Sequence, residues 1–121
     1  MAIKTILVED SQKIRENLIP TLGELANVEI IAVAETQVEA KNAFDAFKGT
    51  WQLVIVDMFL REGTGLGVLR SCQDRTSDQT AFVLTNYPTT EIRRQCAALG
   101  ADGVFDKSIE LDTFIERCLA I

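Results

Sequence analysis

Apolar residues follow two alternating patterns along the chain. Short apolar runs predict β-strands at residues 3–8, 28–34, 53–56, 81–84 and 104–105. Between these runs, apolar residues recur three or four positions apart, which is the spacing of one helix face. These positions are Ile14, Leu18, Leu22 and Leu25, then Ala40, Ala43, Phe44 and Phe47, then Leu66 and Leu69, then Ile92, Cys96 and Leu99, and last Leu111, Phe114, Ile115 and Cys118.

Five strand-helix units with short connections predict an α/β protein with one parallel sheet and helices on both faces. Right-handed crossovers then favour a doubly wound sheet. A glycine-rich loop, containing Gly63, Gly65 and Gly67, precedes the third helix. Pro20 falls inside the first helical pattern and removes one hydrogen bond, so we expect a kink at residues 16–20 rather than a break.

The length of 121 residues suits one domain, at residues 1–121, with its own core. Apolar residues make up 47% and charged residues 25%, which is typical of a globular protein. No apolar run is long enough to span a bilayer, and the N-terminus MAIKTILVED lacks the layout of a signal peptide. We therefore expect a cytoplasmic protein with no membrane partner.

The net charge and the cysteine spacing argue against a nucleic-acid partner and against a cysteine metal site. The net charge of −6 argues against nucleic-acid binding by this domain, because phosphate contacts need a basic patch. Cys72, Cys96 and Cys118 are an odd number and lack the spacing of metal ligands. We predict that all three are reduced and structural, in keeping with a cytoplasmic location.

Histidine is absent from the sequence. This absence excludes Ser-His-Asp and Cys-His nucleophilic sites, histidine general bases and zinc sites that contain histidine. Any chemistry must therefore use carboxylates, lysine and hydroxyl groups.

Polar residues follow the predicted strands, where a doubly wound sheet forms its ligand site. Glu9-Asp10 follow the first strand, Glu35-Thr36 the second, Asp57 the third, Thr85-Asn86 the fourth, and Asp106-Lys107-Ser108 the fifth. If the first and third strands are neighbours, three carboxylates meet at one edge, where like charges need a cation to compensate them. Oxygen ligands without histidine or cysteine favour a hard ion such as Mg²⁺.

Each of these residues also has a plain structural interpretation. Asp10 or Ser11 can cap the first helix, and Asp57 can simply end a strand. Lys107 can be a surface charge and Thr85 a loop hydroxyl. Their joint position at one end of the sheet instead favours a carboxylate nucleophile, a magnesium site, a lysine and a hydroxyl donor, the parts needed to transfer a phosphoryl group to aspartate.

Over its whole length the chain resembles the receiver domain of two-component response regulators, the CheY-like superfamily. The residues that carry the resemblance are Glu9-Asp10, Asp57, Gly65-Leu66, Thr85, Lys107 and the segment GADGVFDKS at residues 100–108. The resemblance implies a flavodoxin-like fold with strand order 2-1-3-4-5 and five helices. It also implies magnesium-dependent transfer of a phosphoryl group from a phosphohistidine to an aspartate.

The resemblance also implies a role for each site residue. Asp57 would be the phosphoacceptor. Glu9, Asp10, Asp57 and the backbone carbonyl of Phe59 would hold Mg²⁺. Lys107 would pair with the carboxylate or the phosphoryl oxygens. Thr85 would hydrogen-bond the phosphoryl group and move toward it, which biases the face formed by the fourth helix, fifth strand and fifth helix.

The implied partners are a sensor histidine kinase or a histidine phosphotransfer protein, together with a downstream protein target. Such a chain would catalyse only its own phosphorylation and dephosphorylation, and so would not be a conventional enzyme. It would act as a switch or relay, alone or as one domain of a longer regulator.

Two positions depart from the family pattern. Val104 stands where the family usually has an aromatic residue that reports activation, and Phe105 should point to the opposite side of the strand. Tyr87 is a candidate substitute. Ser108 stands where proline is common. Because Phe59 and Tyr87 flank the site, we also expect an altered dephosphorylation rate, in a direction that the sequence does not indicate.

Three other functions compete with this interpretation. A receiver used only as an interaction module, without phosphorylation, would typically lack one of the acids or the lysine, and this chain keeps them all. An aspartyl-phosphate phosphatase would usually place a second aspartate at position 59, where this chain has Phe59. A flavin-binding carrier would need a phosphate-binding loop after the first strand, where VEDSQKI would repel phosphate.

Overall fold

Five parallel strands form one sheet in the order β2-β1-β3-β4-β5. The computed structural model describes residues 2–121. The strands are β1 (Ile3–Val8), β2 (Val28–Ala34), β3 (Leu53–Val56), β4 (Thr80–Thr85) and β5 (Gly103–Asp106). Both the class and the strand order agree with the prediction.

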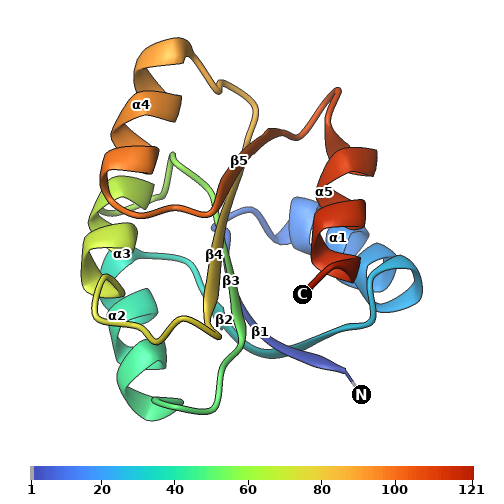
Figure 1. Cartoon of the computed structure of the whole chain (residues 1–121), viewed down its shortest axis with the longest axis horizontal. Coiled ribbons are helices and arrows are strands. Elements are labelled where there is room, and N and C mark those ends of the chain that lie inside the picture. The colour runs from blue at the N-terminus through green and yellow to red at the C-terminus, as the bar shows by residue number, and fades with distance from the viewer. Residues whose placement is uncertain (1) are drawn as a thin grey trace.

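Five helices cover the sheet in two layers, as Figure 1 shows. They are α1 (Gln12–Leu25), α2 (Gln37–Ala46), α3 (Gly65–Ser71), α4 (Thr90–Ala98) and α5 (Leu111–Leu119). Helices α2, α3 and α4 lie on one face, and α1 and α5 lie on the other. Four helices begin at a Ser or Thr side chain that accepts a backbone N–H of the first turn, namely Ser11, Thr36, Thr64 and Thr89.

The third strand shows why an uninterrupted apolar run forms a central strand. Val54 and Val56 pack into the core beneath α2, α3 and α4. Leu53 and Ile55 pack into the second core, beneath α1 and α5. Because successive side chains of a strand point to opposite faces, a strand covered on both sides must be apolar at every position.

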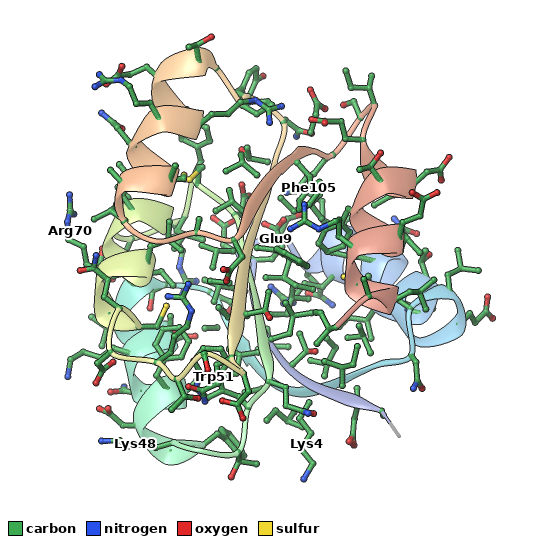
Figure 2. All side chains as sticks on the ribbon, in the orientation of Figure 1. Lys4, Glu9, Lys48, Trp51, Arg70 and Phe105 are labelled. Carbon is green, nitrogen blue, oxygen red and sulfur yellow. The ribbon has the colours of Figure 1, made fainter. Side chains whose placement is uncertain are left out.

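Val104 and Phe105 fall on opposite sides of β5, as predicted. Val104 packs against the core beneath α2, α3 and α4. Phe105 is buried in the other core, with its ring 5.3 Å from that of Phe82 and 5.4 Å from that of Phe114. In Figure 2 it lies in the interior, whereas Lys4, Lys48 and Arg70 extend outward.

The predicted bounds of two strands and the predicted burial of one helix residue were wrong. Strands β4 and β5 extend one residue further at each end, so Thr85 and Asp106 are the last residues of strands rather than the first of loops. Backbone pairing between β4 and β5 continues through these polar residues, because ladder hydrogen bonds do not depend on side-chain polarity. Leu25 is 56% exposed and stays outside the core. Helix α1 is continuous through Pro20, which confirms the prediction that this proline does not break the helix.

The three cysteines are free and buried, as predicted. Burial raises the pKa of the Cys72 thiol to about 11 and that of Cys118 to about 12. Within residues 2–121, no helix is both long and apolar enough to cross a membrane.

Candidate functional site

The site lies where the carboxyl ends of β1 and β3 meet. The backbone N–H of Asp57 donates to the Val8 carbonyl at 3.0 Å, and the N–H of Glu9 donates to the Ala34 carbonyl at 2.9 Å. The connection after β1 runs to β2 and the connection after β3 runs to β4, so these two connections leave the β1–β3 pair in opposite directions. In an open α/β sheet, this switch point forms a crevice at the strand ends.

Three carboxylates converge in this crevice. Oxygen atoms from Glu9, Asp10 and Asp57 all lie within 4.8 Å of one another. The sequence predicted this juxtaposition on the condition that the first and third strands are neighbours, and the pairing of β1 with β3 meets that condition.

Lys107 reaches the same crevice from the β5–α5 connection. Its Nζ lies 2.5 Å from Oε1 of Glu9 and 3.2 Å from Oδ2 of Asp57. Its backbone N–H donates to the Thr85 carbonyl at 2.9 Å, which fixes the point from which the side chain extends. Lys107 is therefore an ion-paired residue of the crevice rather than a solvated surface charge.

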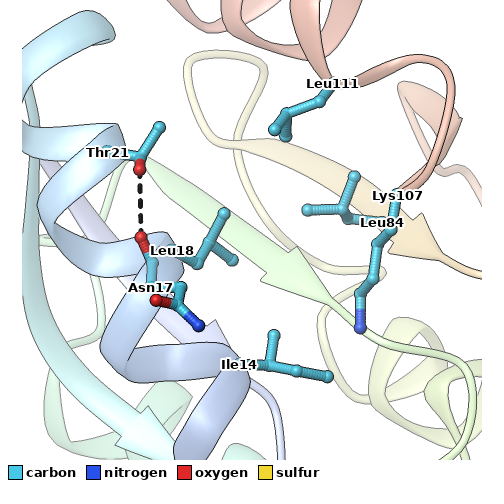
Figure 3. Close-up of a pocket in the computed structure, with 7 residues that line it drawn as sticks. All are labelled: Ile14, Asn17, Leu18, Thr21, Leu84, Lys107 and Leu111. Atoms are coloured by element: carbon cyan, nitrogen blue, oxygen red, sulfur yellow. Dashed lines mark hydrogen bonds between the residues drawn. The ribbon is translucent and has the colours of Figure 1, made fainter.

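The stem of Lys107 lines a groove between α1 and α5. This cavity of ≈ 240 Å³ is otherwise lined mainly by apolar side chains, namely Ile14, Leu18, Leu84 and Leu111, with Asn17 and Thr21 on the α1 side. Figure 3 shows Lys107 extending past Leu84 toward the end of the groove where Ile14 lies. Because lysine carries a long apolar stem, such a wall can hold the stem while the ammonium reaches the acids.

Glu9 is the most buried charged group of the cluster, with 2% of its surface exposed. This burial raises the pKa of its carboxyl, the hydrogen bond from Lys107 lowers it, and the nearby Asp57 raises it again. The net direction is upward. Burial of Glu9 therefore outweighs the lowering effect of its hydrogen bond with Lys107.

The donor set fits a hard divalent cation. When all four groups are ionised, three carboxylates and one ammonium carry a formal charge of −2. The available donors are oxygen atoms, which Mg²⁺ prefers. Glu9, Asp10, Asp57 and the backbone carbonyl of Phe59 are the residues that would hold it.

Helix α1 is capped by Ser11, whose hydroxyl accepts the Ile14 N–H at 3.3 Å. The alternative assignment of Asp10 as the cap is therefore wrong. Its carboxylate is free to join the acidic cluster, one position before the helix cap.

Thr85 is fully buried at the end of β4. Its hydroxyl accepts the backbone N–H of Tyr87 at 3.5 Å, and in the sheet it pairs with Asp106. Thr85 therefore contacts both the β4–α4 connection, through Tyr87, and the end of β5, which precedes Lys107. This position allows a shift at Thr85 to reach the β4–α4 connection directly.

Two exposed aromatic rings stand beside the crevice. Phe59 follows Asp57 by two residues and is 57% exposed, and Tyr87 follows Thr85 by two residues and is 66% exposed. Their rings meet edge to face, with centroids 6.0 Å apart. The two residues that were predicted to flank the site therefore also contact each other.

Arg15 is a site residue that was not predicted from the sequence. Its Nη1 donates to the Glu9 carbonyl at 2.7 Å and to Oε2 of Glu35 at 3.1 Å. Arg15 thus holds the backbone of one acidic residue and neutralises another that follows the neighbouring strand. The only signal in the sequence was its place one helical turn after Ser11, which does not identify its partners.

Arg93, which joins α4, β5 and α5, was also not predicted from the sequence. Its guanidinium donates to the Val104 carbonyl at 2.9 Å, to the Pro88 carbonyl at 3.1 Å and to Oε1 of Glu110 at 2.7 Å. The bonds from Arg93 and from the Asp106 N–H lower the pKa of Glu110. These partners are 5 to 17 residues away in the chain, so helical spacing does not reveal them.

Comparisons with known proteins agree with this geometry. Residues 5–119 match the family described as the response regulator receiver domain. The chain is 26% identical over 108 residues to the DNA-binding transcriptional activator DevR/DosR of Mycobacterium tuberculosis, covering 89% of this chain and 49% of that protein. The chain spans about half the length of the curated relatives it matches.

Solved structures show the same fold. The non-phosphorylated HemR receiver domain of Leptospira biflexa is 25% identical, with a TM-score of 0.81, and the match covers 98% of this chain and 94% of that one. The CheX-CheY-BeF3-Mg²⁺ complex of Borrelia burgdorferi is 15% identical, with a TM-score of 0.86 and coverage of 98% and 87%.

Proposed function

The chain belongs to the receiver domain family of two-component response regulators, and we propose that Asp57 accepts a phosphoryl group in a magnesium-dependent reaction. The observation that carries this proposal is the cluster of Glu9, Asp10 and Asp57 within 4.8 Å, with Lys107 bonded to two of its members. The signalling class follows from the family, and the roles of the individual residues are proposals.

The proposed reaction is an in-line displacement. An Asp57 oxygen attacks phosphorus, the new O–P bond forms, and the P–N bond to the donor imidazole breaks. The imidazole leaves with the bond electrons and takes up a proton. Magnesium, when bound, supplies positive charge that offsets the charge of the acids and of the phosphoryl oxygens.

The chain's own residues position and stabilise the reacting groups. Strands β1 and β3 fix the Asp57 backbone through the bond to Val8. The Lys107 ammonium, already 3.2 Å from Asp57, would follow the charge onto the phosphoryl oxygens. The Thr85 hydroxyl, which accepts the Tyr87 N–H, would donate a hydrogen bond to a phosphoryl oxygen.

Movement of Thr85 would carry the signal to α4, β5 and α5. The β4–α4 connection contains Pro88, whose carbonyl accepts from Arg93, and Arg93 also bonds Val104 and Glu110. A shift of this connection would change the hydrogen bonds of Arg93 on all three elements. The phosphorylated state would then favour a different arrangement of this face, as a population shift.

We propose two kinds of partner. A histidine kinase or a histidine phosphotransfer protein would donate the phosphoryl group, and a downstream protein would bind the altered face. The Borrelia neighbour is a complex of CheY with CheX, BeF3 and Mg²⁺, which supports a protein target and a magnesium site for this chain too. We also propose that the chain catalyses only its own phosphorylation and dephosphorylation.

The test is intact-mass measurement after incubation with Mg²⁺ and acetyl phosphate. We expect one phosphoryl adduct that requires Mg²⁺ and is absent in Asp57→Ala. Asp45→Ala is the matched control, because Asp45 is an exposed acid that pairs with Lys41 on α2. If neither acetyl phosphate nor a phosphohistidine donor modifies the folded protein, the chain is instead an interaction module.

A further inference from the structure

Gly63 lies in the β3–α3 connection, whereas Gly65 and Gly67 are the first and third residues of α3 and not part of the predicted loop before it. All three glycines make room for other groups of the protein. A Cβ added at Gly65 would lie 2.5 Å from the Asp57 carbonyl oxygen. A Cβ at Gly63 would lie 2.4 Å from Cβ of Gln37, and one at Gly67 would lie 2.1 Å from its Oε1. Two of the three glycines therefore give space to one side chain, that of Gln37.

Gln37, the first residue of α2, holds this connection by two hydrogen bonds. Its Oε1 accepts the Thr64 N–H at 3.1 Å, and its own N–H donates to the Glu62 carbonyl at 3.1 Å. The preceding residue, Thr36, forms a bridge with Glu62. The beginning of α2 is thus bound to the loop that follows Asp57.

The same loop pairs with the residues next to Asp57. Phe59 and Thr64 form an antiparallel bridge, and the Gly65 N–H donates to the Met58 carbonyl at 2.9 Å. Because that bond flanks the Phe59–Thr64 pair, the pair is of the kind whose two members do not bond each other. The Thr64 N–H accordingly donates to Gln37 and not to the Phe59 carbonyl.

We propose that Gln37 is a positioning residue of the site. By holding Thr64, it fixes the turn that carries Phe59, two residues after Asp57 and bridged to Thr64. This inference rests on the proposed function, because Phe59 and Asp57 are two of the expected magnesium ligands. Gln37 acts through Thr64, as residues behind a metal ligand commonly orient it.

The test uses metal-free protein titrated with Mg²⁺ and followed by NMR, alongside amide exchange at Thr64. Gln37→Ala removes the acceptor, and the loss of one hydrogen bond should weaken Mg²⁺ binding about 2- to 10-fold and speed exchange at Thr64. Gln37→Glu keeps an acceptor oxygen and should bind Mg²⁺ no more weakly than the wild type. Val38→Ala is the matched control, because Val38 is the next residue of α2 and is 67% exposed.

The outcomes separate the two proposals. If the wild type binds Mg²⁺ and Gln37→Ala binds it equally well, while exchange at Thr64 is faster, Gln37 is only structural and this inference is wrong. If Gln37→Glu is as weak as Gln37→Ala, the acceptor oxygen is not the cause and the inference again fails. A wild-type protein that neither binds Mg²⁺ nor accepts phosphate overturns the proposed function itself.

Discussion

The Lys107 ammonium lies 2.5 Å from Glu9 and 3.2 Å from Asp57, so it is closer to the acid that we do not expect to be phosphorylated. Glu9 is also the more buried of the two, with its side chain 3% exposed against 12% for Asp57. Before phosphorylation, the Lys107 ammonium therefore compensates the charge of buried Glu9, a candidate metal ligand. It also forms a longer hydrogen bond with Asp57, the proposed phosphoacceptor. One charge serves both the stability of the fold and the proposed reaction.

Replacing Lys107 with Met should destabilise the protein at neutral pH without divalent ions. Removing one partner of a buried pair leaves an uncompensated charge, which typically costs about 3–5 kcal/mol. The side chains of Lys107 and Asp57 keep 13% and 12% of their surface exposed, so we expect a smaller loss, about 2 kcal/mol in the free energy of unfolding measured with urea. Lys41→Met is the matched control, because Lys41 pairs with Asp45 on the surface.

The pH dependence of Lys107→Met follows from the raised pKa of Glu9. The folded-state pKa of Glu9 lies above the ordinary 4.5, so protonation of Glu9 stabilises the folded protein. This stabilisation is fully present below pH 4.5 and is lost as the pH rises through the folded-state pKa. Without Lys107 that pKa should rise further. The stability difference between variant and wild type should therefore shrink as the pH falls toward 4.5. An equal stability difference at neutral pH and near pH 4.5 would show that the ionisation of Glu9 is not the cause.

Replacing Thr85 with Ala should separate phosphorylation from signalling. Asp57 and the acidic cluster are untouched, so we expect the Mg²⁺-dependent adduct to form. We expect the amide signals of α4, β5 and α5, including Val104 and Glu110, to shift much less than in the phosphorylated wild type. Thr85→Ser keeps the hydroxyl and should restore the shift. If Thr85→Ala shows the full shift, the hydroxyl is not the link to Arg93.

The fold and the acidic cluster were predictable because they depend on patterns that local sequence carries. A strand such as Leu53–Val56 must be apolar at each position when helices cover both faces, and polar residues at the ends of neighbouring strands must converge. Leu25 shows the limit, since its spacing fits the buried stripe but α1 leaves it exposed near its end.

The supporting side chains were not predictable for a different reason. Arg15, Gln37 and Arg93 act through backbone carbonyls, backbone N–H groups or distant acids, and such partners depend on tertiary packing. A carbonyl acceptor carries no residue type, so the sequence leaves no trace of it. The glycines at positions 63 and 67 were visible, but the neighbour that requires them, Gln37, lies more than 20 residues away in the chain.

Two glycine substitutions should change stability in opposite directions. At Gly65, a Cβ would lie 2.5 Å from the Asp57 carbonyl oxygen and 2.8 Å from the Met58 Cα, and because both are backbone atoms the strand end must move. We expect Gly65→Ala to cost about 2 kcal/mol. At Gly23, inside α1, a Cβ would meet only the Val28 carbonyl oxygen, at 3.9 Å.

Gly23→Ala should therefore stabilise the protein by about 0.5–1 kcal/mol, because alanine is the better helix former. Trp51 is a suitable reporter of unfolding, since it is 4% exposed and its ring lies 5.3 Å from that of Phe44. Fluorescence-detected unfolding in urea measures both variants. A loss at Gly23 similar to that at Gly65 would show that any added Cβ destabilises this chain, and would contradict the clash with Asp57 as the specific cause at Gly65.

The buried cysteines should make thiol reactivity a probe of unfolding. Burial raises the pKa of Cys72 to about 11 and that of Cys118 to about 12, from an ordinary 9.0, so little thiolate forms in the folded protein near neutral pH. We expect an aromatic disulfide reagent to react slowly with the native protein and fully, at all three cysteines, in denaturant. Because the folded pKa values are raised, this stability is present below 9.0 and is lost as the pH rises toward 11 and 12. The free energy of unfolding should thus decline above pH 9.0, and a Cys72→Ala, Cys118→Ala double variant should lose part of that decline. Rapid labelling of the native protein at neutral pH would contradict the burial of these thiols.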